Sequence, residues 1–141
     1  QPSILMSSTE SLFLQAEAAN RGWISGDVEV LYESAIRSSF QYFKTDLSEL
    51  DPYLNQESVK FDGTIARIIE QKWLALNSVS SIEAWNDYRR LGLPNYPATA
   101  ASGISDRPSR LMYPETERGT NLENVEAQGS DELSSKVWWM N

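Results

Sequence analysis

The chain has 141 residues with a formal net charge of -8, and it contains neither cysteine nor histidine. This length suits one ordinary domain, and 40% hydrophobic residues indicate a globular protein rather than a disordered one. The acidic balance disfavours nucleic-acid binding, which needs clustered lysine and arginine. Without Cys and His, the chain has no disulfide, no thiol nucleophile, no histidine base and no thiolate or imidazole metal ligand.

The first two predicted helices form a hairpin. Ser7 and Glu10 have the spacing of a capping box, which predicts a helix over 7–21. Asp27 is an N-cap candidate for a second helix over 28–43, where apolar residues recur at helical spacing along one wide face. Because the connecting segment is short, we expect the two helices to pack antiparallel.

Two further helices follow a break over 52–57. The apolar rhythm predicts the third helix over about 62–76 and the fourth from Ser80 or Ser81 to the glycine at position 92. Trp73 and Trp85 fall on the apolar faces of these helices, so both are expected in the core.

The last third of the chain, from about residue 93 to 141, has a different character. It is rich in proline and glycine and shows no apolar periodicity, so an irregular segment is predicted. A compact domain rarely holds so long a coil, and we expect this segment to wrap a larger body. Trp138 and Trp139 are expected to dock it.

Several motifs occur in a specific order along nearly the whole chain. YESAI at Tyr32 to Ile36 is similar to the second helix of a tetratricopeptide repeat. The series FLQAEAANRGW, YESAIRSSF, IIEQKWLALNSVSSIEAWNDYRRLGLP, RLMYPETERGTNLENVEA and KVWW resembles the C-terminal part of SusD/RagB-like proteins. The resemblance implies a mainly α fold, a SusD-like α-α superhelix of tetratricopeptide-like hairpins with a long irregular C-terminal segment.

The resemblance also implies a function. SusD-like proteins are outer-membrane lipoproteins of Bacteroidetes that bind glycans or other nutrients at the cell surface without catalysis. They deliver the ligand to a SusC-like TonB-dependent transporter. Residues 1–141 would then be a C-terminal fragment, helical over about 7–92 and irregular over about 93–141. The N-terminal remainder of the polypeptide would be a partner and would carry the lipidated cysteine.

Tyr53 and Tyr96 are the candidate ligand-binding residues. Both are expected in exposed loops beside asparagines, and flat rings next to amides suit the apolar face and the hydroxyls of an oligosaccharide or polysaccharide. Family binding residues cannot be carried over, because the ligand loops of SusD-like proteins vary. Catalytic residues, a metal site and a cofactor are not expected.

Three other functions remain open at this stage. The chain could be a helical scaffold that binds only protein, a peptide-importing lipoprotein, or a glycosidase with a carboxylate pair. Acidic residues are numerous, so coincidental pairs are expected and favour the glycosidase little. The acidic run from Asp46 to Asp51 suggests calcium, but it lacks the glycine and the terminal glutamate of an EF-hand loop.

Arg89 and Arg90 stand together near the end of the fourth helix. Neighbouring residues on a helix point about 100° apart, so the two cannot form one flat anion clamp. We expect a structural role, in which one guanidinium stacks on an aromatic ring or holds a carbonyl of the C-terminal segment.

Overall fold

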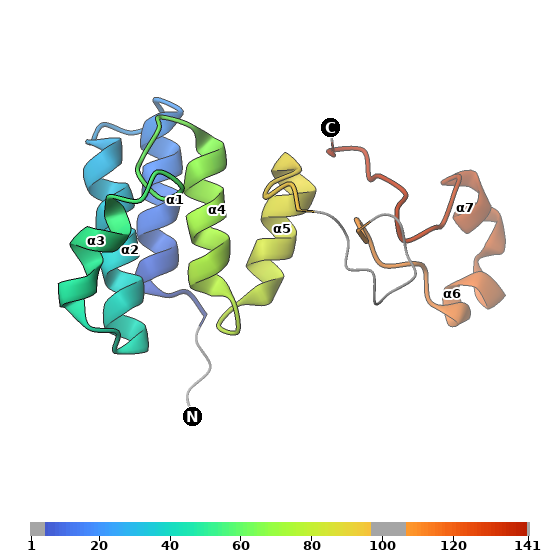
Figure 1. The fold of residues 1–141 in the computed structure, drawn as a ribbon. Helices are drawn as coiled ribbons and strands as arrows, with labels where there is room; N and C mark the ends of the chain where they lie inside the picture. Colours follow the sequence, from blue (N-terminus) through green and yellow to red (C-terminus); the bar gives the residue numbers. More distant parts are fainter. Residues whose placement is uncertain (1–4, 97–106, 141) are drawn as a thin grey trace. The chain divides into compact units, whose positions relative to one another are not determined.

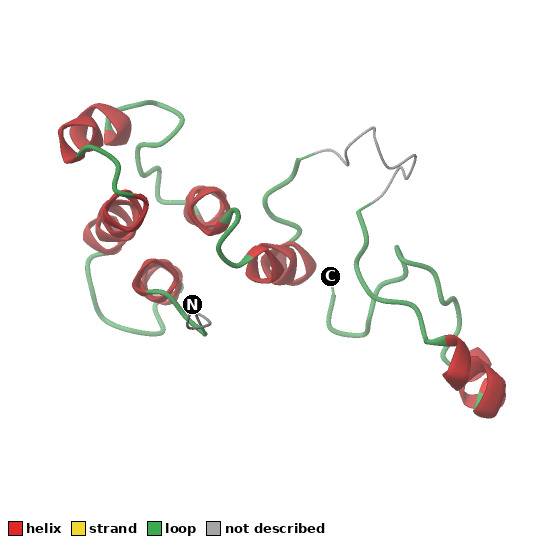
Figure 2. Ribbon diagram, turned by 90° about the horizontal axis from the view of Figure 1, so that it is seen from below, coloured by secondary structure: helices red, strands yellow, loops and turns green. Residues whose placement is uncertain are grey.

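The computed structural model describes residues 5–96 and 107–140. It divides into two compact units, unit 1 (Gln1–Asp87) and unit 2 (Tyr88–Asn141), which are described separately here. Across the described ranges the regular structure is entirely helical, which confirms the predicted mainly α fold (Figures 1 and 2). No helix within these ranges is both long and apolar enough to cross a membrane.

Unit 1 is a layer of helices built around a hairpin. Helices α1, α2 and α4 pack against one another, and α3 packs on α2 (Figure 1). The boundary between the two units falls within α5. The helices are α1 (Ser8–Asn20), α2 (Val28–Phe43), α3 (Leu50–Leu54), α4 (Ile65–Leu76) and α5 (Ser81–Leu91), with a 3-10 turn η1 (Leu47–Glu49) before α3.

The predicted N-caps of the first two helices are confirmed. The Ser7 hydroxyl accepts a hydrogen bond from the Glu10 backbone N–H at 3.1 Å, and the Asp27 carboxylate accepts one from the Val30 N–H at 3.2 Å. Each bond satisfies one of the N–H groups that have no partner within the first turn of the helix. Local sequence therefore determines where α1 and α2 begin.

The third predicted helix begins later than expected, at Ile65. The Asp62 carboxylate accepts hydrogen bonds from the Thr64 N–H at 2.9 Å and from its hydroxyl at 2.6 Å, which orders the turn before the helix. Thr64 is the N-cap, and its hydroxyl accepts from the Arg67 N–H at 3.1 Å. Two capping residues in succession make the start ambiguous in the sequence.

The predicted break over 52–57 is partly wrong, because α3 occupies Leu50–Leu54. Pro52 lies in the first turn of this helix. A residue there has no partner for its N–H within the helix, and the fixed φ of proline suits helical backbone. Pro52 therefore fits inside a short helix that the sequence analysis missed.

The core of unit 1 centres on Tyr32, whose side chain is fully buried. Its ring makes an edge contact with Phe13 at 6.3 Å and a tilted contact with Phe61 at 5.3 Å between ring centroids. Its hydroxyl donates to the Val59 carbonyl, and burial raises the pKa of the phenol. One aromatic residue thus joins α2 to α1 and to the segment before α4.

The interface between α4 and α5 differs from the prediction. Trp73 and Trp85 are half-buried rather than part of the core. Lys72 and Asp87 are buried instead, with 3% and 4% of their surface exposed, and the Lys72 Nζ lies 2.8 Å from the Asp87 Oδ2. Each charge compensates the other, because an isolated buried charge would destabilise the folded state.

Unit 2 contains two short helices that the prediction of an irregular segment missed: α6 (Glu115–Thr120) and α7 (Leu122–Ala127). Helices of six residues are too short to show apolar periodicity. Before α6, the Ser109 N–H donates to the Leu133 carbonyl at 2.7 Å, so the segments on either side of the helix pair lie together.

Asp131 holds these segments of unit 2 in place. Its carboxylate accepts a hydrogen bond from the Tyr113 N–H at 3.1 Å, pairs with Arg110 at 3.1 Å and also binds Arg118 of α6. A single carboxylate with three donors fixes the turn into α6 more firmly than an isolated surface pair would.

Candidate functional site

Unit 1 contains a cavity of about 310 Å³ between α2, α3 and α4. Aromatic side chains form much of its lining, and the polar side chains among them are uncharged. Its lining includes Ser39, Phe40, Phe43, Thr45, Tyr53 and Gln71. Tyr53, one of the two predicted ligand residues, therefore lines this cavity.

Tyr53 is held from two sides. Its ring packs against Phe40 with 5.4 Å between centroids and an angle of 54° between planes. Its hydroxyl donates to the Gln71 Oε1 at 2.7 Å, and burial raises the pKa of the phenol, so the group is neutral. The prediction of an exposed loop was wrong, because Tyr53 belongs to α3 and is half-buried. The helix gives the ring a fixed orientation.

The mouth of the cavity is apolar and open. Phe43 is 49% exposed and Leu74 is 43% exposed, and both line the cavity. The Ser39 and Thr45 hydroxyls add groups that can donate and accept hydrogen bonds. All lining side chains are uncharged. This lining suits a neutral ligand with an apolar face and several hydroxyls, and it offers nothing to a phosphate.

Tyr96, the second predicted residue, belongs to unit 2 and is 39% exposed. Its backbone N–H donates to the Pro94 carbonyl at 3.0 Å, which also accepts a hydrogen bond from Arg107 at 2.9 Å. Tyr96 is thus exposed, as the sequence indicated, and these hydrogen bonds hold the segment that carries it. It lines none of the hollows described here, so its role in binding stays a prediction.

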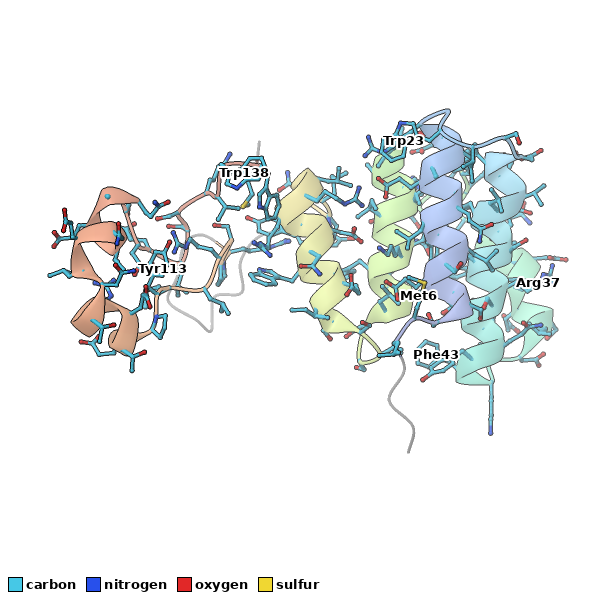
Figure 3. All side chains as sticks on the ribbon, turned by 180° about the vertical axis from the view of Figure 1, so that it is seen from behind. Met6, Trp23, Arg37, Phe43, Tyr113 and Trp138 are labelled. Atoms are coloured by element: carbon cyan, nitrogen blue, oxygen red, sulfur yellow. The ribbon has the colours of Figure 1, made fainter. Side chains whose placement is uncertain are left out.

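Arg89 has the structural role that the sequence predicted. Its Nε donates to the Ser109 carbonyl at 2.7 Å, and its guanidinium lies over the Trp139 ring at 4.7 Å. One side chain therefore both holds a carbonyl and stacks on an aromatic ring. Trp139 is docked as predicted. Trp138 is 95% exposed in this chain, so its docking stays a prediction (Figure 3).

A cluster of charged side chains lies buried in unit 1 and bears on the glycosidase hypothesis. Glu10, Lys72 and Asp87 are each at most 5% exposed, and burial raises the pKa of Glu10. A hydrolytic carboxylate pair must flank a bond of the substrate. These groups are instead buried, Lys72 pairs with Asp87, and the charges of both act on Glu10. We assign them a structural role.

The calcium hypothesis finds no support. Asp46 accepts a hydrogen bond from the Ser48 backbone N–H at 2.9 Å, caps η1, and has a pKa lowered by this bond. In the described part of the chain, the acidic residues form no group of three arranged to hold a metal ion. In this acidic run, Asp46 caps η1, and Glu49 and Asp51 are exposed to solvent.

Comparison with known proteins decides the family. Residues 1–114 match the SusD-like family model described as "Starch-binding associating with outer membrane". This chain belongs to the SusD-like family. A comparison with curated proteins found no match.

Solved SusD-like structures have the same fold as this chain. A SusD homologue from Bacteroides fragilis is 30% identical, with a TM-score of 0.82, over 99% of this chain and 35% of its own length. A Bacteroides vulgatus protein described as a "putative outer membrane protein, probably involved in nutrient binding" is 31% identical, with a TM-score of 0.82, over 100% of this chain and 35% of its own. A chitin-binding protein is 28% identical, with a TM-score of 0.75, over 96% and 33%. The chain therefore spans about a third of the length of these SusD-like proteins.

Sequence reasoning missed most of the cavity lining. Phe40 and Phe43 lie on the apolar stripe of α2, a pattern that by itself indicates only a buried face. Nothing in the sequence indicates that Gln71 lines a cavity, because a single glutamine on a helix belongs to no recognisable binding motif. The useful signal was the length of the apolar stripe, which continues past the point where α1 can cover α2.

Proposed function

We propose that this chain is part of a non-catalytic glycan-binding protein of the bacterial outer membrane, which delivers its ligand to a SusC-like TonB-dependent transporter. The observation that carries the proposal is the neutral, aromatic-lined cavity around Tyr53 in a SusD-like fold. Aromatic rings bind the apolar faces of sugars, and amide and hydroxyl groups bind their hydroxyls. The N-terminal remainder of the polypeptide, with its lipid anchor, completes the proposed protein.

The names of related proteins support the choice of ligand. The family description refers to starch, and one solved relative is a chitin-binding protein. Maltoheptaose and chitohexaose are therefore suitable probes. Because uncharged side chains line the cavity, the affinity should change little with sodium chloride concentration, whereas binding to a phosphate backbone weakens steeply.

Calorimetry of the protein with both oligosaccharides tests this proposal. We expect binding of at least one probe, a nearly constant dissociation constant across sodium chloride concentrations, and recovery of the uncleaved oligosaccharide by chromatography. Cleaved product would indicate a glycosidase. Failure to bind any member of a broader glycan panel, together with tight capture of a peptide, would indicate a peptide importer or a protein-binding scaffold.

Matched variants locate the binding. Phe43→Ala removes an exposed ring at the mouth of the cavity and should weaken binding about tenfold, the scale of one lost stacking contact. Trp23→Ala removes a ring that is 71% exposed but lies at the opposite end of unit 1, and it should leave binding unchanged (Figure 3). Equal losses in both variants would contradict a site in this cavity.

The transporter partnership has its own test. Purification of the protein from the outer membrane in mild detergent should recover a TonB-dependent transporter in constant ratio. Recovery without a transporter under conditions that preserve other outer-membrane complexes would leave only the glycan-binding part of the proposal.

A further inference from the structure

Unit 2 carries a second hollow, smaller and more polar than the cavity of unit 1. Its volume is about 160 Å³, the space of about five water molecules. It is lined by Tyr113, Glu117, Asn121, Asn124, Val125 and Gln128. This volume suits a single sugar residue rather than a chain of them.

The helix pair α6 and α7 places the polar lining along one side. Glu117 lies in α6, Asn121 lies between the two helices, and Asn124 and Gln128 are four residues apart at α7 and its C-terminal end, so that all four line the same hollow. Val125, only 5% exposed, lies in the same hollow and supplies an apolar surface. The hollow therefore combines one buried apolar residue with a row of polar groups.

Hydrogen bonds orient this row. The Asn121 Nδ2 donates to the Glu117 Oε1 at 2.6 Å, and the Asn124 Nδ2 donates to the Asn121 Oδ1. Each amide nitrogen carries two protons, and each carbonyl or carboxylate oxygen can accept more than one bond. The row therefore offers donors and acceptors alternately, in fixed orientations. Sugar hydroxyls, which both donate and accept, match such a row.

The aromatic wall is equally fixed. The Arg110 guanidinium lies 4.9 Å from the Tyr113 ring centroid, and the Tyr113 N–H donates to Asp131. Asp131 also pairs with Arg110 and with Arg118 of α6, so one carboxylate holds the Tyr113 backbone, the guanidinium over its ring and the helix that carries Glu117. A site whose walls are held before the ligand arrives loses less entropy on binding.

We propose that this hollow binds one neutral sugar residue, at a site separate from the cavity of unit 1. The choice of a sugar rests in part on the proposed function, whereas the site rests on its own lining. Glu117 repels anions and no cation lines the hollow, so phosphate and acidic peptides are disfavoured. One carboxylate with amides is too few charged ligands for a tightly bound divalent cation.

Nuclear magnetic resonance with glucose and N-acetylglucosamine, the units of starch and chitin, tests the proposal on the protein labelled with nitrogen-15. The side-chain amide signals of Asn121, Asn124 and Gln128 should shift together and saturate with one of the two sugars. The signal of Asn95, an exposed amide of unit 2 outside the hollow, should not move.

Variants test the same contacts. Asn124→Ala and Gln128→Ala should each weaken the binding of that sugar about two- to tenfold, as expected for one lost hydrogen bond. Glu123→Gln, an exposed position of α7 outside the hollow, should leave it unchanged. If Asn124→Ala fails to fold, the amide shifts of the unaltered protein still decide the question.

The outcomes separate this proposal from the proposed function. Oligosaccharide binding that responds to Phe43→Ala, with no shift of the unit 2 amides by either sugar, would overturn the second site and leave the glycan-binding function standing. Shifts of these amides without binding to the unit 1 cavity would support the second site alone. Absence of binding by any saccharide would overturn both.

Discussion

At the scale of single residues, the buried pair of Lys72 and Asp87 has the largest predicted effect on stability. Lys72→Met should lower the free energy of unfolding by about 3–5 kcal/mol, because it removes the ammonium group that pairs with the buried Asp87 carboxylate. The double variant Lys72→Met, Asp87→Leu should recover most of this loss, since it removes both charges. Denaturant unfolding of the unaltered protein, the single variant and the double variant measures these differences in the free energy of unfolding. A loss below about 1 kcal/mol in the single variant would contradict this prediction, because it is the size expected for a solvent-exposed ion pair.

Glu10 gives a dependence on pH. Burial is the main reason that its pKa is raised, with Glu83 and Asp87 adding to the effect and Lys72 opposing it. Above the ordinary pKa of 4.5, Glu10 is ionised in the unfolded chain but keeps its proton longer in the folded one. Unfolding then releases a proton, so its contribution to stability is present at low pH and is lost as pH rises through the folded pKa.

The variant Glu10→Gln isolates this contribution. Its free energy of unfolding relative to the unaltered protein should rise between about pH 4.5 and pH 7, because glutamine has no proton to lose. Urea unfolding at several pH values measures the difference. A relative stability that falls over the same range would mean that the ionised carboxylate is stabilised by Lys72 more than it is penalised by burial.

At the scale of elements, the caps determine where helices begin. Asp27→Ala should lower the free energy of unfolding by about 1 kcal/mol, within the range of about 0.5–2 kcal/mol for a lost N-cap. Asp27→Asn keeps an oxygen that accepts from the Val30 N–H and should cost only a small fraction of this. Equal losses in the two variants would show that charge rather than capping is responsible.

Some helices were predicted correctly from the sequence, and others were missed. The helices with a clear N-cap, α1 and α2, were predicted to within a residue at each end. The missed elements, α3, α6 and α7, have five or six residues each. Such short helices gain little from propensity and form because neighbouring segments hold them, as Asp131 holds the turn into α6.

At the scale of the whole molecule, hydrophobic burial is unequal between the units. In the described residues, Val125 is the one buried hydrophobic side chain of unit 2 apart from Pro94, whereas unit 1 buries Phe13, Tyr32, Ile68 and others. Hydrophobic burial is the main favourable contribution to folding. The two units should therefore differ in stability when the chain is studied alone.

Hydrogen exchange of the 141-residue chain checks this expectation. Backbone amides of α1, α2 and α4 should be protected, while those of α6 and α7 should exchange far faster, and thermal unfolding should lack a single sharp transition. A sharp two-state melt, with uniform protection in both units, would contradict this and would also oppose the expectation that the chain needs a larger body.

The sequence by itself determined the helical class, the starts of α1 and α2, the family resemblance and the structural role of Arg89. These depend on local spacing, on caps and on the order of motifs, which the chain carries whatever it packs against. Only the tertiary structure decided that Lys72 and Asp87 are buried while Trp73 and Trp85 are half-buried. It also placed Phe40, Tyr53 and Gln71 around one cavity and ordered the amide row of unit 2. The contacts of the cavity join residues far apart in the sequence, and their geometry depends on how helices pack, which no local pattern encodes. The amide row joins residues three and four positions apart, but it depends on the break between α6 and α7 at Asn121.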